Sequence, residues 1–381
     1  MPNYPEGATD VTTQVQVTEL AHKLVAAREL SIDVEADSLH AFHARLCFVQ
    51  IGTDSDVFLV DTLAEGLSLG PLAELFQDPG RTKFFHAAQG DLQFLAEAGL
   101  RVQGLFDTHR AATLLGWPKV GLADLVREKM DIVLAKEHQQ ADFAQRPLPP
   151  ELRKYIAEDV RYLNQIGRWV QEACRTADIY EEVELDCRRM SDEAQVRPDI
   201  AGASPKLPKL GSPQEQVFAV TLSKALHLRR LAWAEAADVP MGKMLSNAAI
   251  VSVVTRPPKN LRELAKAQGV RGQVVREHGE EILKLAADLG AQSARGELAL
   301  VDAGRGARDP KKKKREEQLK QFRGERALAR KVTPSVVLSN PLVEALAEAP
   351  PESLEALGAV PYFGEKRVRL YGEALLKLLK A

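Results

Sequence analysis

Residues 30–60 read LSIDVEADSLHAFHARLCFVQIGTDSDVFLV and contain three apolar runs close together in the chain. The runs at 30–34, 45–52 and 56–60 have the composition of β-strands, and residues 52–55 (GTDS) between the last two are typical of a turn. Strands that follow one another this closely pair as hairpins, so this part of the sheet is expected to be antiparallel.

The segments around this stretch alternate between helical and extended patterns. A short apolar strand is predicted at 83–85. Helical apolar spacing occurs at 17–28, 69–76, 91–98, 108–115, 122–130 and 151–173. Strands that are separated by helices run parallel to the first strand. The first half of the chain is therefore predicted to be an α/β domain with a mixed sheet.

Acidic residues and one tyrosine form three short clusters in this half of the chain. Asp33 and Glu35 are two apart on a predicted strand, so both side chains point to one face of the sheet. Tyr155 and Asp159 are four apart on a predicted helix, so they lie one turn above each other. Asp91 stands where the next predicted strand turns into a helix. The carboxylates together supply the hard oxygen ligands that Mg²⁺ or Mn²⁺ prefers.

The order of these clusters resembles that of a known enzyme family. Asp-x-Glu, His-Ala-x-x-x-Asp and Tyr-x-x-x-Asp begin at Asp33, His86 and Tyr155. They are similar to the motifs of the DEDDy family of 3′-5′ exonucleases, and within it to ribonuclease D. The resemblance implies an α/β ribonuclease H-like exonuclease domain.

The resemblance continues between the motifs. Asp107-Thr108 opens a predicted helix, and residues 136–148 (KEHQQADFAQRPL) resemble the loop that precedes the third motif in that family. Phe143 is a departure, because many relatives have Trp at this position, and a stacking role there is less well supported.

The resemblance also implies a mechanism, in which two divalent metal ions, Mg²⁺ or Mn²⁺, assist phosphodiester hydrolysis. It implies that Asp33 bridges the ions, that Glu35 and Asp159 complete the site on the nucleophile side, and that Asp91 lies nearer the second ion. Tyr155 is expected to orient the attacking water, since its ordinary pKa near 10 makes it a poor base at neutral pH. Nucleoside 5′-monophosphates would leave one at a time from the 3′ end.

The C-terminal half contains an internal repeat with a constant offset of about 93 positions. Residues 245–247 and 338–340 both read LSN, and the pair Gly279-Glu280 recurs as Gly372-Glu373. Both copies resemble the HRDC domain, a small helical module found behind ribonuclease D and RecQ-type helicases. Two small all-α HRDC-like domains are therefore expected after the exonuclease domain.

The domain organisation follows from these observations. We expect an exonuclease domain at 1–196, a linker rich in Pro, Gly and Ser at 197–213, a first HRDC-like domain at 214–296, a basic linker at 297–315 and a second HRDC-like domain at 316–381. The lysine run within 304–318 is interpreted as a solvated connector. Few contacts should cross the first linker, so a chain that ends at about residue 213 is expected to fold as a nuclease.

The charge is distributed unevenly although the net charge is only −2. Residues 1–200 carry about 20 basic and 33 acidic side chains, and residues 201–381 carry about 31 and 20. A basic C-terminal half could hold RNA by releasing counterions from its phosphates. The candidate phosphate contacts, which could equally be exposed helix charges, are Arg271, Arg276, Lys366, Arg367 and Arg369.

His86 is expected to fix the turn between strand and helix by hydrogen bonding. Contact with the nucleic acid or with a metal-bound water is the alternative for this residue.

Length and composition argue against a membrane-spanning protein and against a secreted protein. A chain of 381 residues with 45% hydrophobic and 27% charged residues is typical of a globular protein with two or three domains. No apolar run reaches the roughly 18 residues that span a bilayer, and residues 1–14 lack the features of a secretion signal. Three cysteines without metal-ligand spacing are typical of reduced thiols, so a cytoplasmic location is expected.

Three functions remain open at this point. The first is a 3′-5′ exoribonuclease that acts, as a monomer, on the 3′ ends of tRNA precursors and other small structured RNAs. The second is a 3′-5′ exodeoxyribonuclease of the proofreading or repair type, because the metal site alone does not distinguish RNA from DNA. The third is an inactive nucleic-acid-binding scaffold, which the intact carboxylates and tyrosine disfavour.

Overall fold

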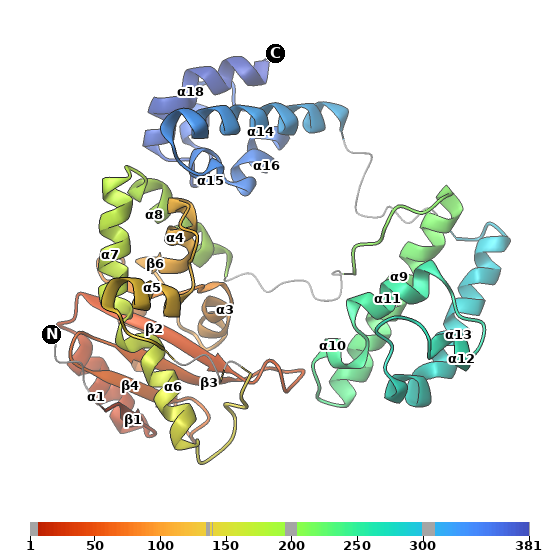
Figure 1. The fold of residues 1–381 in the computed structure, drawn as a ribbon, viewed down its shortest axis with the longest axis horizontal. Coiled ribbons are helices and arrows are strands. Elements are labelled where there is room, and N and C mark those ends of the chain that lie inside the picture. The colour runs from red at the N-terminus through yellow and green to blue at the C-terminus, as the bar shows by residue number, and fades with distance from the viewer. Residues whose placement is uncertain (1–6, 135–137, 139, 195–203, 299–308, 381) are drawn as a thin grey trace. The chain divides into compact units, whose positions relative to one another are not determined.

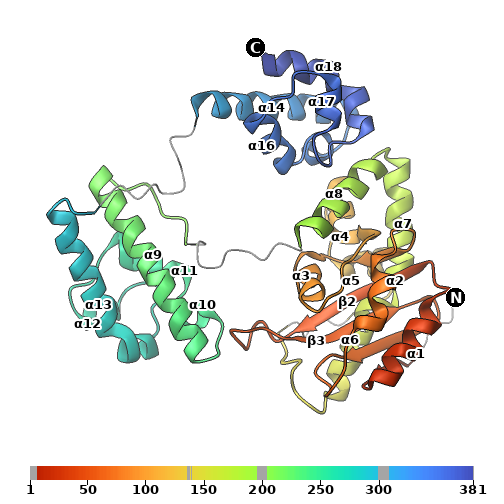
Figure 2. The same cartoon turned by 180° about the vertical axis from the view of Figure 1, so that it is seen from behind.

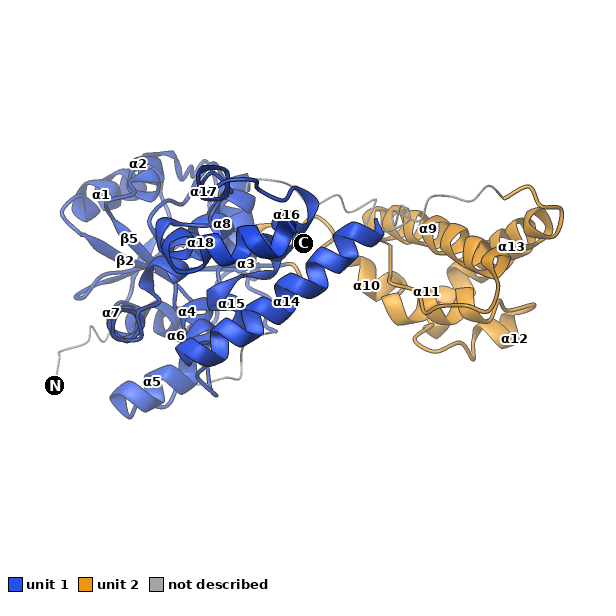
Figure 3. Ribbon diagram, turned by 90° about the horizontal axis from the view of Figure 1, so that it is seen from above, with its two compact units in different colours: residues 1–37, 46–197, 309–381 blue, residues 38–45, 198–308 orange. Residues whose placement is uncertain are grey.

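The computed structural model describes residues 7–134, 138, 140–194, 204–298 and 309–380. These residues divide into two compact units (Figure 3), one from the ranges 1–37, 46–197 and 309–381 and the other from 38–45 and 198–308. Residues 136, 137 and 139 of the predicted loop, 197–203 of the first linker and 299–308 of the basic linker lie outside the described residues.

The first unit begins with a six-stranded sheet and its helices (Figure 1). The strands are β1 (Thr9–Val11), β2 (Glu29–Ala36), β3 (Leu46–Gly52), β4 (Val57–Asp61), β5 (Thr82–Phe85) and β6 (Leu105–Asp107). The helices are α1 (Gln14–Leu24), η1 (Gly70–Leu72), α2 (Ala73–Gln77), α3 (Gln89–Glu97), α4 (Thr108–Leu115), α5 (Leu122–Met130), α6 (Pro150–Arg161), α7 (Leu163–Thr176) and α8 (Tyr180–Glu193).

The strand order is β1-β4-β3-β2-β5-β6. β2, β3 and β4 form an antiparallel meander, whereas β5 pairs parallel to β2 and β6 pairs parallel to β5. The predicted mixed sheet is confirmed. Two three-residue strands were not predicted: β1, which pairs parallel to β4, and β6.

Both faces of the sheet are covered, as β4 shows. Val57 and Leu59 belong to an apolar cluster with residues of α6, and Phe58 and Val60 belong to the cluster that includes residues of α1. Alternate residues of a strand point to opposite faces. Accordingly α6 lies in front of the sheet in Figure 1, and α1 and α2 lie in front of it in Figure 2.

The expected single helix over 151–173 is two helices in the structure. α6 ends and α7 begins at Tyr162, whose backbone angles (φ −104°, ψ −8°) interrupt the regular helix. The interruption lets α6 lie over β2, β3 and β4 while α7 packs against β2 and β5.

Within the described residues, two groups of five helices follow the sheet. The second unit contains α9 (Pro213–Ala236), α10 (Met241–Met244), α11 (Asn247–Thr255), α12 (Leu261–Leu264) and α13 (Gly272–Ala294). The C-terminal group, which belongs to the first unit, contains α14 (Pro310–Arg330), α15 (Pro334–Val337), α16 (Asn340–Glu348), α17 (Leu354–Gly358) and α18 (Glu365–Lys380). The predicted all-α character of both copies is confirmed.

The internal repeat is visible in equivalent hydrogen bonds. The Arg230 guanidinium donates to Leu245 O at 2.9 Å and to Asn247 Oδ1 at 2.7 Å. In the second copy the Arg323 guanidinium donates to Leu338 O at 3.2 Å and to Asn340 Oδ1 at 2.8 Å. The LSN sequences therefore recur because each copy uses them to hold the first long helix to the third helix.

The lysine run was expected in a solvated connector, and this interpretation is wrong for residues 310–318. They form the start of α14, where Asp309 caps the helix by accepting from Lys311 N and Pro310 occupies the first turn. Leu319 and Phe322 then bury one face of the helix. Among the residues that the structure describes, none of the helices is both long and apolar enough to cross a membrane.

Candidate active site

Strand β2 supplies two carboxylates from the middle of the sheet. Asp33 and Glu35 lie on one face of β2, which is paired on both sides, with β3 and with β5. A register shift between Glu35 and Ala36 ends the regular pairing with β3 directly after the second carboxylate.

Helix α6 brings Tyr155 and Asp159 over this face of the sheet. The Ser31 hydroxyl donates to Val160 O at 2.8 Å, and Gly52 lies at the same point of the sheet. A Cβ at position 52 would lie 2.9 Å from Val160 O, so a glycine is required for this close approach of helix and sheet. The local sequence therefore determines how near α6 comes to β2.

The carboxylates of Asp33, Glu35 and Asp159 converge. One oxygen from each lies within 4.8 Å of the others. The convergence predicted for the strand pair and the helix is present in the structure.

Asp91 joins this group from the first turn of α3. Burial raises the pKa of Asp91, and the nearby charges of Asp33 and Asp107 raise it further. Burial likewise raises the pKa of Glu35 to about 10, with added effects from Asp33, Asp159 and Asp91. Four carboxyl groups therefore share one electrostatic environment.

The chemistry of this donor set fits divalent cations. Burial raises the pKa of Asp33 to about 7, and burial followed by the charge of Asp33 raises the pKa of Asp159. Within the described part of the chain, no Lys or Arg forms an ion pair with any of the four carboxylates. Hard oxygen ligands without a protein counter-ion are the ligand set that Mg²⁺ and Mn²⁺ prefer.

A cavity of about 480 Å³ opens at the cluster. Asp33, Glu35, Tyr155 and Asp159 line its acidic side, and His86 also reaches it. The other lining residues are mainly apolar; they are Val34, Gly121, Leu122, Ala123, Leu134 and Leu163. These wall residues were not recognised from the sequence, because their apolar pattern is that of any core helix.

Tyr155 lies half-buried beside the carboxylates. Its ring stacks on Phe143 at a centroid distance of 6.3 Å and meets His138 edge-on at 5.7 Å. Burial, followed by the charges of Asp159, Glu35 and Asp33, raises the pKa of the Tyr155 hydroxyl above its ordinary value. The hydroxyl is therefore protonated at neutral pH and available as a hydrogen-bond donor, and Phe143 packs the tyrosine ring.

His86 lies at the turn between β5 and α3. Its Nδ1 is 2.9 Å from the Thr108 hydroxyl, which itself donates to Phe85 O at 2.9 Å, so we assign the proton to Nδ1. Burial, with a smaller effect of His109, lowers the pKa of His86 to about 3. The imidazole is neutral at physiological pH, and its hydrogen bond holds the turn to the start of α4.

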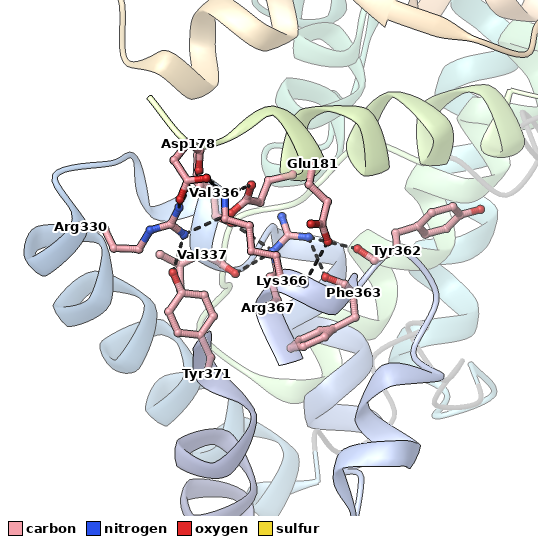
Figure 4. A network of polar contacts seen from close by, with 11 residues as sticks. Asp178, Glu181, Arg330, Val336, Val337, Tyr362, Phe363, Lys366, Arg367 and Tyr371 are labelled. Carbon is pink, nitrogen blue, oxygen red and sulfur yellow. Dashed lines mark hydrogen bonds and ion pairs between the residues drawn. The ribbon is translucent and has the colours of Figure 1, made fainter. Parts of the chain in front are cut away.

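Two of the predicted phosphate contacts, Lys366 and Arg367, are buried inside the first unit (Figure 4). The Lys366 ammonium lies 3.1 Å from the Glu182 carboxylate and 2.9 Å from that of Asp178. The Arg367 guanidinium donates to the carbonyl oxygens of Val336, Val337, Tyr362 and Phe363. These cations have protein acceptors and little solvent access, so we remove both from the expected RNA contacts.

The other three candidates are exposed. Arg271 donates one hydrogen bond to Lys243 O at 3.1 Å, and Arg276 and Arg369 lie on the solvent sides of α13 and α18. Arg271 and Arg276 belong to the second unit, and Arg369 belongs to the first. The structure thus divides the predicted cations between its two units.

Comparison with protein families matches two kinds of domain. A family described as 3′-5′ exonuclease matches residues 9–171, and the HRDC domain matches residues 221–285 and 312–379. The first match covers the four carboxylates and Tyr155, and the second occurs once in each copy of the repeat.

Curated relatives and a solved structure resemble most of the chain. Ribonuclease D of Jannaschia sp. (strain CCS1) is 31% identical over 301 residues, which is 77% of each protein. Ribonuclease D of Gluconacetobacter diazotrophicus is 30% identical over 280 residues, 73% of this chain and 70% of that protein. The crystal structure of Escherichia coli RNase D has a TM-score of 0.67 at 23% identity, covering 98% of this chain and 99% of that one.

Proposed function

Because this chain belongs to the ribonuclease D family, it is a 3′-5′ exoribonuclease, and we propose that Asp33, Glu35, Asp91, Asp159 and Tyr155 form its catalytic site. The observation that carries this proposal is the convergence of oxygens from Asp33, Glu35 and Asp159 within 4.8 Å at the cavity. The family relationship favours RNA over the alternative of DNA, since the curated relatives are ribonucleases.

We propose that Asp33, Glu35, Asp91 and Asp159 would hold two divalent cations, Mg²⁺ or Mn²⁺. When bound, such ions supply a nucleophile at neutral pH and neutralise charge on the phosphate and on the leaving oxygen. The carboxyl groups must lose their protons to bind cations, so their raised pKa values add to the cost of binding and cation affinity should fall as the pH falls.

The remaining groups of the site position the reactants. The Tyr155 hydroxyl would orient the attacking water as a hydrogen-bond donor or acceptor, with its ring fixed by Phe143. In the reaction the water oxygen bonds to phosphorus and the bond from phosphorus to the 3′-oxygen of the preceding nucleotide breaks. That oxygen takes up a proton, and the terminal nucleotide leaves as a 5′-monophosphate.

We further propose that the substrates are tRNA precursors and other small structured RNAs, acted on by a monomer in the cytoplasm. The E. coli structure is described as an exoribonuclease involved in structured RNA processing, which supports this substrate class. The basic C-terminal half of the chain also supports it, since it suits a folded polyanion.

The second unit offers a surface for that RNA. Residues 256–276 carry six exposed cations and one carboxylate, Glu263; the cations are Arg256, Lys259, Arg262, Lys266, Arg271 and Arg276. Arg256 and Lys266 also line a cavity of about 840 Å³ whose walls are partly polar and partly apolar and include Glu263. We propose that this surface holds phosphates of the RNA body while the 3′ end is cleaved.

We also propose a division into domains, in which one boundary differs from the expectation from sequence. We retain the nuclease domain at 1–196, the linker at 197–213 and the first HRDC-like domain at 214–296. Because α14 begins at Pro310, we now start the second HRDC-like domain there instead of at residue 316.

The activity is tested with purified protein and end-labelled RNA and DNA of one sequence. With Mg²⁺ or Mn²⁺ the RNA is expected to shorten from its 3′ end to nucleoside 5′-monophosphates, faster than the DNA. EDTA should stop the reaction, and added metal should restore it. Equal or faster loss of the DNA would favour the deoxyribonuclease, and no loss of either would favour the inactive scaffold.

The RNA surface is tested by replacing Arg271 and Arg276 with Gln. Binding of a structured RNA should weaken and its salt dependence should become shallower, because fewer phosphates are neutralised. The matched control replaces two exposed cations of the other unit, Lys377 and Lys380, by Gln. If the two double substitutions weakened RNA binding equally, the proposed RNA surface would be wrong.

A further inference from the structure

Asp107 is a buried carboxylate that the proposed mechanism does not use. It ends β6, it is 1% exposed, and none of its oxygens lines the cavity. Its oxygens accept hydrogen bonds from Ala87 N at 3.1 Å, from Ala88 N at 2.8 Å and from Arg110 N at 3.0 Å. Two of these three donors, Ala87 and Ala88, lie 20 and 19 residues earlier in the sequence, in the turn between β5 and α3.

This turn has an unfavourable backbone conformation. Ala87 has φ of +65°, in the left-handed region that is unfavourable for a residue with a Cβ. In this conformation of the turn the N–H groups of Ala87 and Ala88 both donate to the Asp107 carboxylate. The two hydrogen bonds offset the cost and hold the turn in place.

The turn determines where Asp91 lies. Ala88 is the residue before α3, and its carbonyl oxygen accepts the hydrogen bond from Leu92 N at 2.9 Å. Asp91 lies in the first turn of α3, so its position follows from the path of the chain at Ala87 and Ala88. A shift of the turn would move Asp91 away from the other three carboxylates.

We propose that Asp107 is a positioning residue for the catalytic site: it locks the turn at Ala87 and Ala88 and thereby holds Asp91 against the other carboxylates. This proposal rests on the proposed nuclease site. Asp107 also caps α4 through Arg110 N, so a test must separate loss of a helix cap from loss of the turn.

The test compares Asp107→Asn with a variant that loses only a cap. The asparagine keeps one acceptor oxygen but places an amide N–H₂ group against one of the turn's donors. Ser353→Ala is the control, because Ser353 caps α17 by accepting from Ala356 N in the same unit but far along the chain from the turn. Three quantities are measured: binding of Mn²⁺ alone by calorimetry, kcat on RNA, and hydrogen exchange of the peptide 84–92.

Asp107→Asn should weaken Mn²⁺ binding and lower kcat about 10-fold or more, as for residues that orient metal ligands. It should also speed exchange in the 84–92 peptide, whereas Ser353→Ala should change none of the three. The exchange measurement needs neither metal nor activity, so it reports on Asp107 even if the proposed function is wrong. If exchange in this peptide stays at the wild-type rate, or if Ser353→Ala matches Asp107→Asn, the positioning role is wrong.

A second substitution tests the mechanism by rescue. Glycine adopts φ of +65° at little cost. The double variant Asp107→Asn/Ala87→Gly should therefore bind Mn²⁺ at least threefold more tightly than Asp107→Asn. Ala87→Gly alone should bind Mn²⁺ with the wild-type affinity. Absence of any rescue would show that Asp107 does not act through the turn.

Discussion

The ammonium of Lys366 lies 3.1 Å from the carboxylate of Glu182, and both side chains are almost fully buried. Lys366 lies in the first turn of α18, and Glu182 lies on α8 of the nuclease domain (Figure 4). Arg330 lies 3.2 Å from the same carboxylate and donates to the Tyr371 hydroxyl at 2.7 Å. The C-terminal helical group is thus part of one folded body with the nuclease domain.

The first prediction concerns this ion pair. Lys366→Met leaves the buried Glu182 carboxylate with Arg330 as its remaining cation; a fully uncompensated buried charge costs about 3–5 kcal/mol, so this is the upper bound of the loss. The free energy of unfolding from urea titration should fall by up to this amount, and Lys377→Met, at an exposed position of the same helix, should leave it unchanged. An equal and small effect of both substitutions would mean that the pair contributes little to holding the two parts together.

The second prediction concerns deletions. A chain that ends at residue 212 loses the C-terminal group, and with it Val336, which packs in the core of the nuclease domain. Contrary to the expectation from sequence, this chain should be unstable. A protein in which a flexible linker replaces residues 205–298 should instead fold and degrade short unstructured RNA, while binding structured RNA more weakly and with a shallower salt slope.

This prediction is checked by measuring the melting temperatures of the two deletion proteins and of the full chain. Similar melting temperatures for the chain ending at 212 and for the full chain would contradict the docked arrangement. A full salt slope in the internal deletion would show that the second unit does not neutralise phosphates.

The third prediction concerns Tyr155. Tyr155→Phe removes the hydroxyl and keeps the ring against Phe143. If the hydroxyl orients water, kcat should fall about 10²-fold with little change in RNA affinity. Tyr180→Phe, which removes a hydroxyl of α8 away from the cavity, is the control and should keep the wild-type kcat. An unchanged kcat in Tyr155→Phe would reduce Tyr155 to a packing residue.

The fourth prediction concerns pH. Lys83 on β5 is fully buried, and burial lowers the pKa of its ammonium to about 7. Between about pH 7 and pH 10 the unfolded chain then carries a proton that the folded protein lacks, so stability rises with pH in this window. The free energy of unfolding of the wild type, relative to Lys83→Met, should increase from pH 7 to pH 9. A constant difference would mean that Lys83 remains charged in the folded protein.

The sequence predicts those parts of the site that depend on local spacing. Asp33 and Glu35 share a face because they are two apart on a strand, and Tyr155 and Asp159 face one cavity because they are one helical turn apart. That the two pairs belong to one site was predicted from the resemblance, since spacing alone says nothing about contacts between distant segments.

The parts that could not be predicted depend on contacts between residues far apart in the chain. Lys366 was interpreted as an RNA contact because a lysine in a basic segment looks exposed until its partner, Glu182, 184 positions earlier, is known. Asp107 looks like an ordinary helix cap, and its bonds to the turn at Ala87 and Ala88 depend on the parallel pairing of β5 and β6.

The central claim is that the converging carboxylates carry out the chemistry, and the most direct measurement is kcat of Asp33→Ala on end-labelled RNA at saturating Mg²⁺ or Mn²⁺. The charge of Asp33 acts on each of the other three carboxyl groups, so Asp33 is central to the cluster. Its loss should lower kcat by several orders of magnitude, while the circular dichroism spectrum and melting profile show that the fold is kept. Glu65→Ala, which removes an exposed carboxylate of the same domain, should retain the wild-type kcat. If Asp33→Ala keeps a tenth or more of the wild-type turnover, the assignment of the catalytic site is wrong.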